Sequence, residues 1–285
     1  MNQAQSYAPL IGITASTLGS PPLPELVDAM VKAELRVLSF WPPATYQRAR
    51  ADGWSDRDMR ALFKDNDIVV HDADALVAWV GPDDPGGPYF EETTPDQVFA
   101  AAKGMGGRFV NALLTGRRAN VTVDGAAEVL AGVCDRAAEH GLGITVEFAT
   151  RSAVNDIATA CAVIERSGRT NVGICMDTWA YHFGTCGLDA LAEAVPRIFT
   201  LQLDDAPAER PEDFGHATRY HRLVPGDGAI DYPGIFGTLA AGNSTAPVIL
   251  EVFNDELLAQ HGVVGFARHL ADATRAVLRT HGSSG

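Results

Sequence analysis

The sequence predicts an α/β fold, a (β/α)₈ TIM barrel, as a single domain over residues 1–285. Short apolar runs typical of strands alternate along the whole chain with amphipathic stretches typical of helices. The strand-like runs are almost continuously apolar, as in a parallel sheet that helices cover on both faces. Eight such strand–helix pairs fit into 285 residues, which is the usual size of this kind of barrel.

Each of the eight predicted strands is followed by a predicted helix. The strands are expected at residues 10–14, 35–40, 67–71, 108–114, 143–148, 172–177, 198–203 and 247–252. The helices are expected at residues 23–33, 56–65, 95–104, 123–141, 154–168, 188–195, 232–242 and 263–281. A doubly wound open sheet is the alternative, but no G-x-G-x-x-G motif follows a strand.

Charge and cysteine usage exclude several classes of partner. The formal net charge is −14, which disfavours binding to nucleic acid and to anionic membrane surfaces. The four cysteines form no C-x-x-C pair, and no disulfide framework is indicated, so a reducing cytoplasm is expected. The first residues lack the features of a signal peptide, and no apolar run has the length of a membrane span. We therefore expect a cytoplasmic protein.

Four oxygen-bearing side chains lie at or near the ends of the last four predicted strands. They are Glu147, Asp177, Gln202 and Glu251. In a barrel these strand ends meet at one mouth. Each carboxylate could merely cap a helix, but three of them at one mouth disfavour joint ionisation without a cation. The set suits a divalent metal ion, Mn²⁺, Mg²⁺ or Co²⁺, and Zn²⁺ is also compatible.

Four further side chains are candidates for contact with a substrate. His182 could act as an acid, a base or a hydrogen-bond donor, or be a simple loop histidine. Arg222 could grip a substrate oxygen with two hydrogen bonds, or form a surface ion pair. Trp179 could wall a pocket, and His71 is a weaker candidate at the mouth.

At these residues the chain resembles the xylose isomerase-like superfamily of TIM barrels, also called the sugar phosphate isomerase/epimerase group. The matching segments are VEFAT, NVGICMDTW, LQLDDAP, HRLVPGDGAIDYPGI and VILEVFNDEL. The first hundred residues match mainly in the order and length of elements. Members of the family hold a divalent metal with Glu, Asp, His and Glu from four consecutive strands.

Three of these ligands match directly, as Glu147, Asp177 and Glu251, whereas Gln202 stands where the family has histidine. That glutamine, with the LQ-x-x-DAP and R-x-x-PG-x-G stretches, is similar to bacterial 3-dehydroshikimate dehydratases. The resemblance implies that Asp205 orients the ligand at position 202. The family also has a D-x-x-H motif after strand six. Here position 180 is alanine, so either a small insertion keeps His182 in that role or the role is lost.

The resemblance implies a metal-dependent isomerase or epimerase acting on an α-hydroxy ketone, as a sugar or a polyhydroxylated ring. Glu147 and Glu251 would exchange protons with substrate carbon, and Arg222 and His182 would hold substrate oxygens. A dehydratase of the 3-dehydroshikimate or inosose type is the alternative.

Two other classes remain less favoured. A non-catalytic ligand-binding barrel is supported only by Ala180. An endonuclease IV-like nuclease needs a histidine-rich metal site and a basic groove, which eight scattered histidines and the net charge oppose. Whether the chain forms a homo-oligomer is left open.

Overall fold

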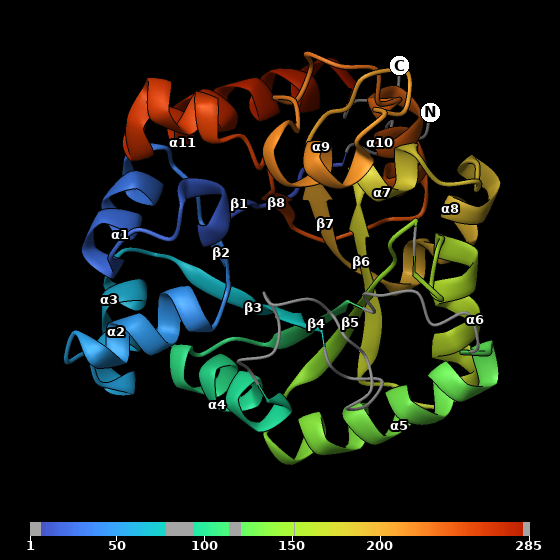
Figure 1. Ribbon diagram of the computed structural model, residues 1–285, viewed down its shortest axis with the longest axis horizontal. Coiled ribbons are helices and arrows are strands. Elements are labelled where there is room, and N and C mark those ends of the chain that lie inside the picture. The colour runs from blue at the N-terminus through green and yellow to red at the C-terminus, as the bar shows by residue number, and fades with distance from the viewer. Residues whose placement is uncertain (1–6, 78–93, 114–120, 151, 282–285) are drawn as a thin grey trace, which may run out of the picture.

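Eight parallel strands close into a barrel in which each strand pairs with the next one along the chain, and β8 pairs with β1 (Figure 1). The computed structural model describes residues 7–77, 94–113, 121–150 and 152–281. The strands are β1 (Ile11–Thr14), β2 (Val37–Phe40), β3 (Val69–Leu76), β4 (Phe109–Leu113), β5 (Gly143–Glu147), β6 (Val172–Asp177), β7 (Ile198–Leu203) and β8 (Val248–Leu250). The predicted TIM barrel is confirmed.

Strand β3 differs most from the prediction, because it continues beyond His71 to Leu76. In this extension Asp72 and Asp74 alternate with two alanines. Successive residues of a strand face opposite sides of the sheet, so the two aspartates share a face. A contact between Asp74 and Gln202 on β7, across the ring, shows that this face is the barrel interior.

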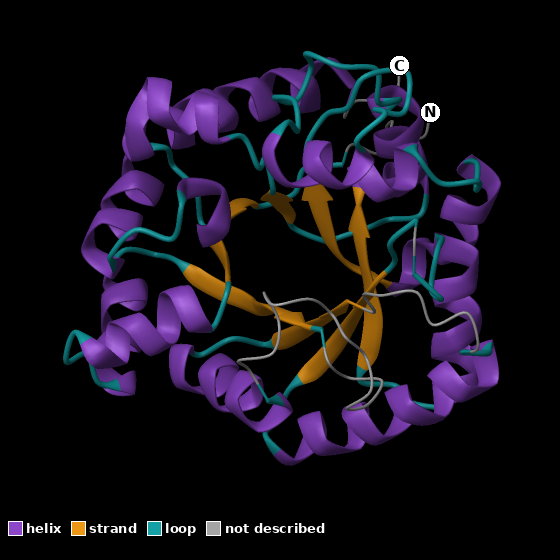
Figure 2. Cartoon of the chain, viewed as in Figure 1, coloured by secondary structure: helices purple, strands orange, loops and turns teal. Residues whose placement is uncertain are grey.

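Helices surround the barrel on its outside (Figure 2). The main ones are α1 (Leu23–Lys32), α3 (Asp56–Asp65), α4 (Pro95–Met105), α5 (Val123–Glu139), α6 (Ile157–Ser167), α8 (Leu188–Ala194), α10 (Tyr232–Ala241) and α11 (Asp255–His281). Each corresponds to a predicted helix. Three short helices were not predicted, namely α2 (Arg48–Ala51), α7 (Thr178–His182) and α9 (Phe214–Tyr220). Within the described residues, no helix combines the length and the apolar character that crossing a membrane requires.

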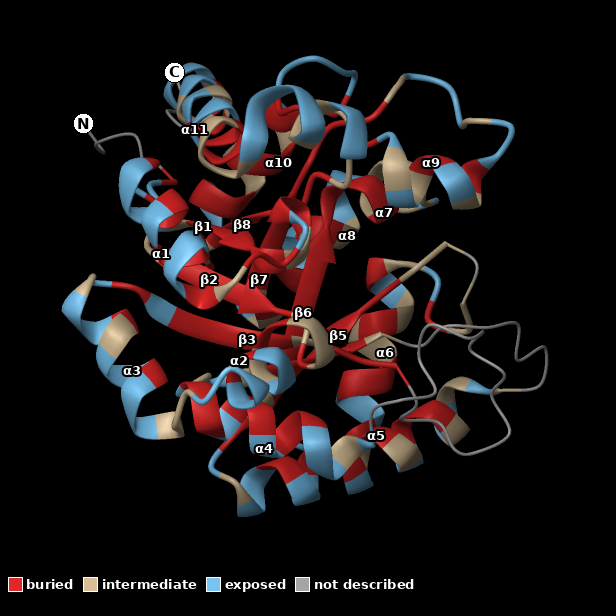
Figure 3. Ribbon diagram, turned by 60° about the vertical axis from the view of Figure 1, so that its left-hand side comes forward, coloured by how far each residue is buried: buried red, intermediate tan, exposed pale blue. Residues whose placement is uncertain are grey.

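The outer helices bury one face each against the barrel (Figure 3). In α5 the buried residues recur at helical spacing, as Ala126, Ala127, Leu130, Val133, Cys134 and Ala137. The helix begins where the Thr122 side chain accepts a hydrogen bond from the backbone N–H of Gly125. Local capping and the apolar stripe therefore specify the same helix.

Two phenylalanines fill the amino-terminal end of the barrel. Phe109 begins β4 and Phe199 is the second residue of β7, and their ring centroids lie 5.5 Å apart. Glycines on neighbouring strands make room for them: a Cβ on Gly143 would lie 2.8 Å from the Phe109 ring, and one on Gly173 would collide with the Phe199 ring. Packing thus closes this end, and the carboxylates of Glu147, Asp177 and Glu251 lie at the other end, where β5, β6 and β8 finish.

Candidate active site

The structure places the four predicted ligands on the carboxyl-terminal ends of adjacent strands. Glu147 ends β5, Asp177 ends β6, Gln202 is the next-to-last residue of β7, and Glu251 directly follows β8. All four are buried, with exposed fractions between 1% and 8%. Burial of three carboxylates requires compensating charge or hydrogen bonds nearby.

The compensating charge is the guanidinium of Arg222, which is 4% exposed. Its Nη1 lies 3.1 Å from Asp177 Oδ2 and 3.0 Å from Glu251 Oε2. The same nitrogen donates a 2.6 Å hydrogen bond to Asp204 Oδ2. Burial opposes the charged form of Arg222, but these carboxylates outweigh it and raise its pKa. The sequence predicted a substrate-binding arginine; Nη1 is engaged by the protein, whereas Nη2 makes no hydrogen bond to any described residue.

Asp204, which sequence reasoning missed, holds Arg222 in place. Its Oδ1 accepts a 2.6 Å hydrogen bond from Thr178, and Oδ2 accepts the bond from Arg222. Burial, with the nearby carboxylate of Asp177, raises the pKa of Asp204 to about 8. On the other side the Phe253 ring lies 4.9 Å from the guanidinium carbon. The arginine is therefore a fixed part of the site.

Gln202 connects this group to β3. Its Nε2 donates to Glu251 Oε1 at 3.1 Å and to Asp74 Oδ2 at 2.9 Å. Its Oε1 is buried and has no hydrogen-bond partner among the described residues. An unpartnered buried oxygen is costly unless a ligand supplies the missing interaction.

Asn111 makes the corresponding contacts on the side of Glu147. Its Nδ2 lies 2.5 Å from Glu147 Oε2 and 2.9 Å from Asp74 Oδ1. Its Oδ1 accepts a hydrogen bond from Thr145. Asp74 and Asn111 were also missed from the sequence. For Asn111 the available indication was a polar residue inside the buried strand-like run at 108–114, where a parallel strand is otherwise apolar. Asp74 lies beyond the strand predicted at 67–71, so no such indication applied to it.

Both glutamates are held in an environment that favours their protonated forms. Burial raises the pKa of Glu147 well above its usual range, and the carboxylates of Asp74 and Asp177 raise it further. Burial also raises the pKa of Glu251, which Arg222 partly offsets. Carboxyl groups with raised pKa values hold and release protons nearer neutral pH than exposed ones do.

In the structure, the His182 side chain contacts residues outside the carboxylate cluster. It ends α7, and its Nε2 lies 3.1 Å from the backbone oxygen of Pro207. Its ring packs edge-on against Phe183. Position 180, where the family has histidine, is a buried alanine. Two residues correspond to about 200° of rotation on a helix, so His182 faces away from the direction of position 180.

Trp179 supports Arg222 from outside the cluster. It is 2% exposed, and its Nε1 donates to Thr218 Oγ1 at 3.0 Å. The backbone oxygen of Thr218 in turn accepts from Arg222 Nε. The ring stacks with Phe214 at 5.8 Å. Trp179 was expected to wall a pocket, and the structure instead shows it packed among these side chains.

His71 lies in the amino-terminal half of β3, away from the predicted mouth position. Its Nε2 is 2.9 Å from Thr200 Oγ1, and its ring lies 5.1 Å from that of Phe109. The side chain is 5% exposed. Burial, with the nearby charge of Arg108, lowers the pKa of His71 to about 4. It belongs to the closed end of the barrel.

We expect His71 to make the fold sensitive to acid. The unfolded chain takes up a proton near pH 6.5, but folded His71 resists protonation down to about pH 4. Stability is therefore lost as the pH falls between these values, by about 3 kcal/mol in full. In urea unfolding at pH 7 and pH 4.5, His71→Gln should lose about 2 kcal/mol less than wild type between the two pH values. The exposed His216→Gln should match wild type, and equal losses in all three proteins would contradict the prediction.

Asp205 has a different role from the one the resemblance implied. Its carboxylate accepts backbone hydrogen bonds from Gly226, Gly228 and Ile230, as well as from its own neighbour Ala206. A Cβ on Gly228 would collide with Asp205 Oδ1, so this close approach requires glycine. Asp205 anchors the segment after Arg222 instead of contacting Gln202.

The donor set fits a divalent metal in its chemistry. Three carboxylates and one amide oxygen match the preference of hard and borderline cations, and the unpartnered Gln202 Oε1 provides a free lone pair. Among the described residues, however, no three His, Cys, Asp or Glu side chains are already arranged around one ion position. Arg222 Nη1 occupies the space between Asp177 and Glu251. Metal binding would therefore replace contacts that Arg222 now makes.

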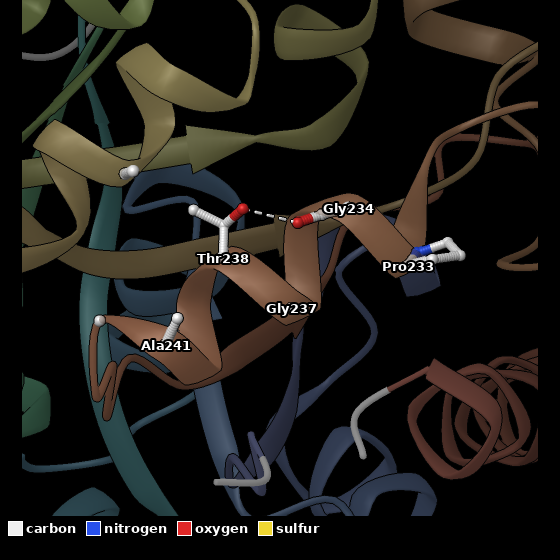
Figure 4. Close-up of a pocket in the computed structure, with 7 residues that line it drawn as sticks. Pro233, Gly234, Gly237, Thr238 and Ala241 are labelled. Carbon is white, nitrogen blue, oxygen red and sulfur yellow. Dashed lines mark hydrogen bonds between the residues drawn. The ribbon is translucent and has the colours of Figure 1, made fainter. Parts of the chain in front are cut away.

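A groove on the outside of the barrel offers no comparable chemistry (Figure 4). It lies between α8 and α10, has a volume of about 560 Å³, and is lined by Ala192, Pro233, Gly234, Gly237, Thr238, Ala241 and Gly242. The Thr238 hydroxyl donates to the backbone oxygen of Gly234 within the same helix. The carboxylate cluster is therefore the candidate active site.

Known proteins share parts of this chain. An inosose isomerase of Bacillus velezensis is 32% identical over 135 residues, covering 46% of this chain and 46% of that protein. A 3-dehydroshikimate dehydratase of Pseudomonas aeruginosa is 32% identical over 135 residues, covering 45% of this chain and 20% of that protein. The match thus spans less than half the length of each relative.

Solved structures share the fold over almost the whole chain. The IOLI protein with a bound zinc atom superposes with a TM-score of 0.81 at 19% identity, over 95% of this chain and 98% of the other. An L-ribulose 3-epimerase superposes with a TM-score of 0.69 at 19% identity, over 95% of both chains. The model of the xylose isomerase-like TIM barrel family matches residues 27–280. The chain therefore belongs to the xylose isomerase-like TIM barrel family.

Proposed function

We propose that this protein is a divalent-metal-dependent isomerase or epimerase that transfers a proton on an α-hydroxy ketone, either a sugar or a polyhydroxylated ring. The observation that carries the proposal is the pair of buried glutamates, Glu147 and Glu251, each held by an amide side chain at the carboxyl end of the barrel. The relatives named inosose isomerase and the fold shared with an L-ribulose 3-epimerase support the same reaction class.

Two carboxyl groups suffice for a proton transfer between carbons. One glutamate removes the proton from the carbon beside the carbonyl, and the other returns a proton. Return to the opposite face of the same carbon gives an epimer. Return to the former carbonyl carbon, with the proton of the α-hydroxyl passing to the former carbonyl oxygen, gives an isomer. Arg222 Nη2, which no described residue engages, is available to bind a substrate oxygen.

The metal would be held by Glu147, Asp177, Gln202 and Glu251. When bound, a divalent cation polarises the substrate carbonyl and makes the adjacent C–H bond more acidic. The oxygen-only donor set favours Mn²⁺, Mg²⁺ or Co²⁺. The zinc atom bound by the IOLI protein, which shares this fold, supports a divalent ion as the cofactor.

Gln202 offers a direct test of the ligand set. An imidazole nitrogen binds borderline transition metals more strongly than an amide oxygen does. We expect Gln202→His to raise the affinity for Zn²⁺ and Co²⁺ relative to Mg²⁺, by about tenfold or more. Competition titration calorimetry of both proteins measures this ratio. An unchanged metal preference would place Gln202 outside the ligand set.

A dehydratase is the second candidate, because the same site could expel a β-hydroxyl after removing the α-proton. Gln202 at the ligand position and the match to a 3-dehydroshikimate dehydratase favour it. The two reactions differ in their product: dehydration forms a conjugated double bond with a new ultraviolet absorbance, whereas epimerisation and isomerisation conserve composition.

The deciding experiment incubates metal-free protein with keto-inositols, ketopentoses, ketohexoses and 3-dehydroshikimate in D₂O, with Mn²⁺, Mg²⁺, Co²⁺ or Zn²⁺, or with EDTA. Proton NMR follows deuterium entry at the α-carbon and the product formed. We expect exchange with at least one substrate class, and its loss in EDTA. No exchange and no product with any ion would refute an enzyme of this kind and favour a binding protein.

A further inference from the structure

A chain of hydrogen bonds joins the two glutamates through one aspartate. It runs from Glu147 to Asn111, then to Asp74, then to Gln202, and ends at Glu251. The four bonds measure 2.5, 2.9, 2.9 and 3.1 Å in that order. Asp74 on β3 lies opposite Gln202 on β7 in the ring of strands, so this series of hydrogen bonds crosses the barrel.

In this series of hydrogen bonds the two amide nitrogens donate and the carboxyl oxygens accept. Each amide nitrogen carries two hydrogens, and each divides them between Asp74 and one glutamate. Asp74 Oδ1 accepts the hydrogen bond from Asn111, and Asp74 Oδ2 accepts the one from Gln202. The Asp74 carboxyl group also forms a side-chain hydrogen bond with that of Glu251, so Asp74 contacts this glutamate directly as well as through Gln202.

The arrangement also decides where the amide oxygens point. An amide that turned over would bring its oxygen against the Asp74 carboxylate, which is unfavourable. With the nitrogen held, Asn111 Oδ1 accepts from Thr145, and Gln202 Oε1 is left buried without a partner. That oxygen is the one that the proposed metal would use.

We propose that Asp74 is a positioning residue that sets the two proton-transferring glutamates and turns the Gln202 oxygen toward the metal. This inference rests on the proposed function for its metal readout. Its geometric content concerns only the Asn111 and Gln202 amides. The family resemblance implied that Asp205 would orient the ligand at position 202. Both carboxylate oxygens of Asp205 instead accept hydrogen bonds from backbone N–H groups.

The first test needs neither metal nor substrate. The side-chain NH₂ resonances of Asn111 and Gln202 are assigned by their loss in Asn111→Asp and Gln202→Glu. In wild type we expect both to be protected from solvent exchange. Asp74→Asn has one oxygen for two donors, so at least one amide should lose protection and shift. Asp74→Glu keeps the charge but displaces the oxygens, and should show the same loss.

Asp72→Asn is the matched control. Asp72 is a buried aspartate on the same strand and face, and its Oδ1 has no hydrogen-bond partner among the described residues. The Asn111 and Gln202 amide resonances of this variant should match wild type. Equal changes in Asp72→Asn and Asp74→Asn, or none in either Asp74 variant, would overturn the positioning role.

The second test measures divalent metal affinity by calorimetry. Asp74→Asn should weaken binding by about 10–100-fold, the usual effect of removing a group that orients a ligand. In the Gln202→His background no amide needs orienting there, so the same change should cost about threefold or less. An undiminished loss in that background would overturn the inference. Absence of metal binding by wild type would refute the proposed function instead, and the NMR test would still decide the role of Asp74.

Discussion

Arg222→Met is expected to lower the free energy of unfolding by about 3–5 kcal/mol, because it leaves a buried group of carboxylates without its countercharge. Methionine keeps much of the length and apolar contact of the arginine stem. Asp177, Asp204 and Glu251 each lie within 3.1 Å of the nitrogen that is lost. Urea unfolding at pH 7 measures the change.

Arg210→Met is the matched control, since Arg210 also stacks on an aromatic ring, that of Phe214, but is exposed. We expect a change of about 0.5 kcal/mol or less for it. A loss below about 1 kcal/mol in Arg222→Met would mean that the carboxylates do not depend on this guanidinium.

Glu251→Gln and Glu147→Gln should each slow α-proton exchange by about 10²–10⁴-fold, the range for loss of a positioned acid or base. Glutamine keeps the size of the side chain and an oxygen, so metal and substrate binding should suffer less than the chemical step. Deuterium entry followed by NMR, at saturating metal, gives the rate. A fall in kcat with little change in KM is the expected pattern.

The exposed Glu165→Gln on α6 serves as the control and should retain the wild-type rate. If exchange persists near that rate in Glu251→Gln or Glu147→Gln, the glutamate concerned acts only as a ligand or as a structural group. One silent glutamate and one essential glutamate would indicate a one-base mechanism, in which the same carboxyl removes and returns the proton.

The barrel was predictable because every level of the sequence agrees on it. Apolar runs and amphipathic stretches repeat eight times in one order, and all eight predicted helices are present. Strand ends in a parallel barrel meet at one place, so Glu147, Asp177, Gln202 and Glu251 could be grouped before any contact was known. Their exact partners could not be predicted in the same way.

The missed residues show why. Asp74 was missed because two aspartates that alternate with alanines were taken to lie beyond the end of a strand. The strand in fact continues through them, and their side chains face the barrel interior. Asp204 lies next to Asp205 in sequence, and only the fold shows that one binds Arg222 and the other binds backbone N–H groups. His71 lies on the expected strand but near the amino-terminal end of the barrel. His182 lies after the expected strand but on a face of α7 that points away from the direction of position 180. Spacing along the sequence predicts neither position.

The aromatic layer at the base of the barrel has a consequence for how such a protein changes over evolutionary time. Phe109, Phe199 and the two glycines that admit them keep one end of the barrel packed without involving the carboxylate cluster. Segments at the other end can therefore be exchanged, lengthened or recruited for a new substrate while the packed layer stays the same. Because the packed end and the reactive end of the barrel are separate, one inherited scaffold can diversify its chemistry with little risk to its folding.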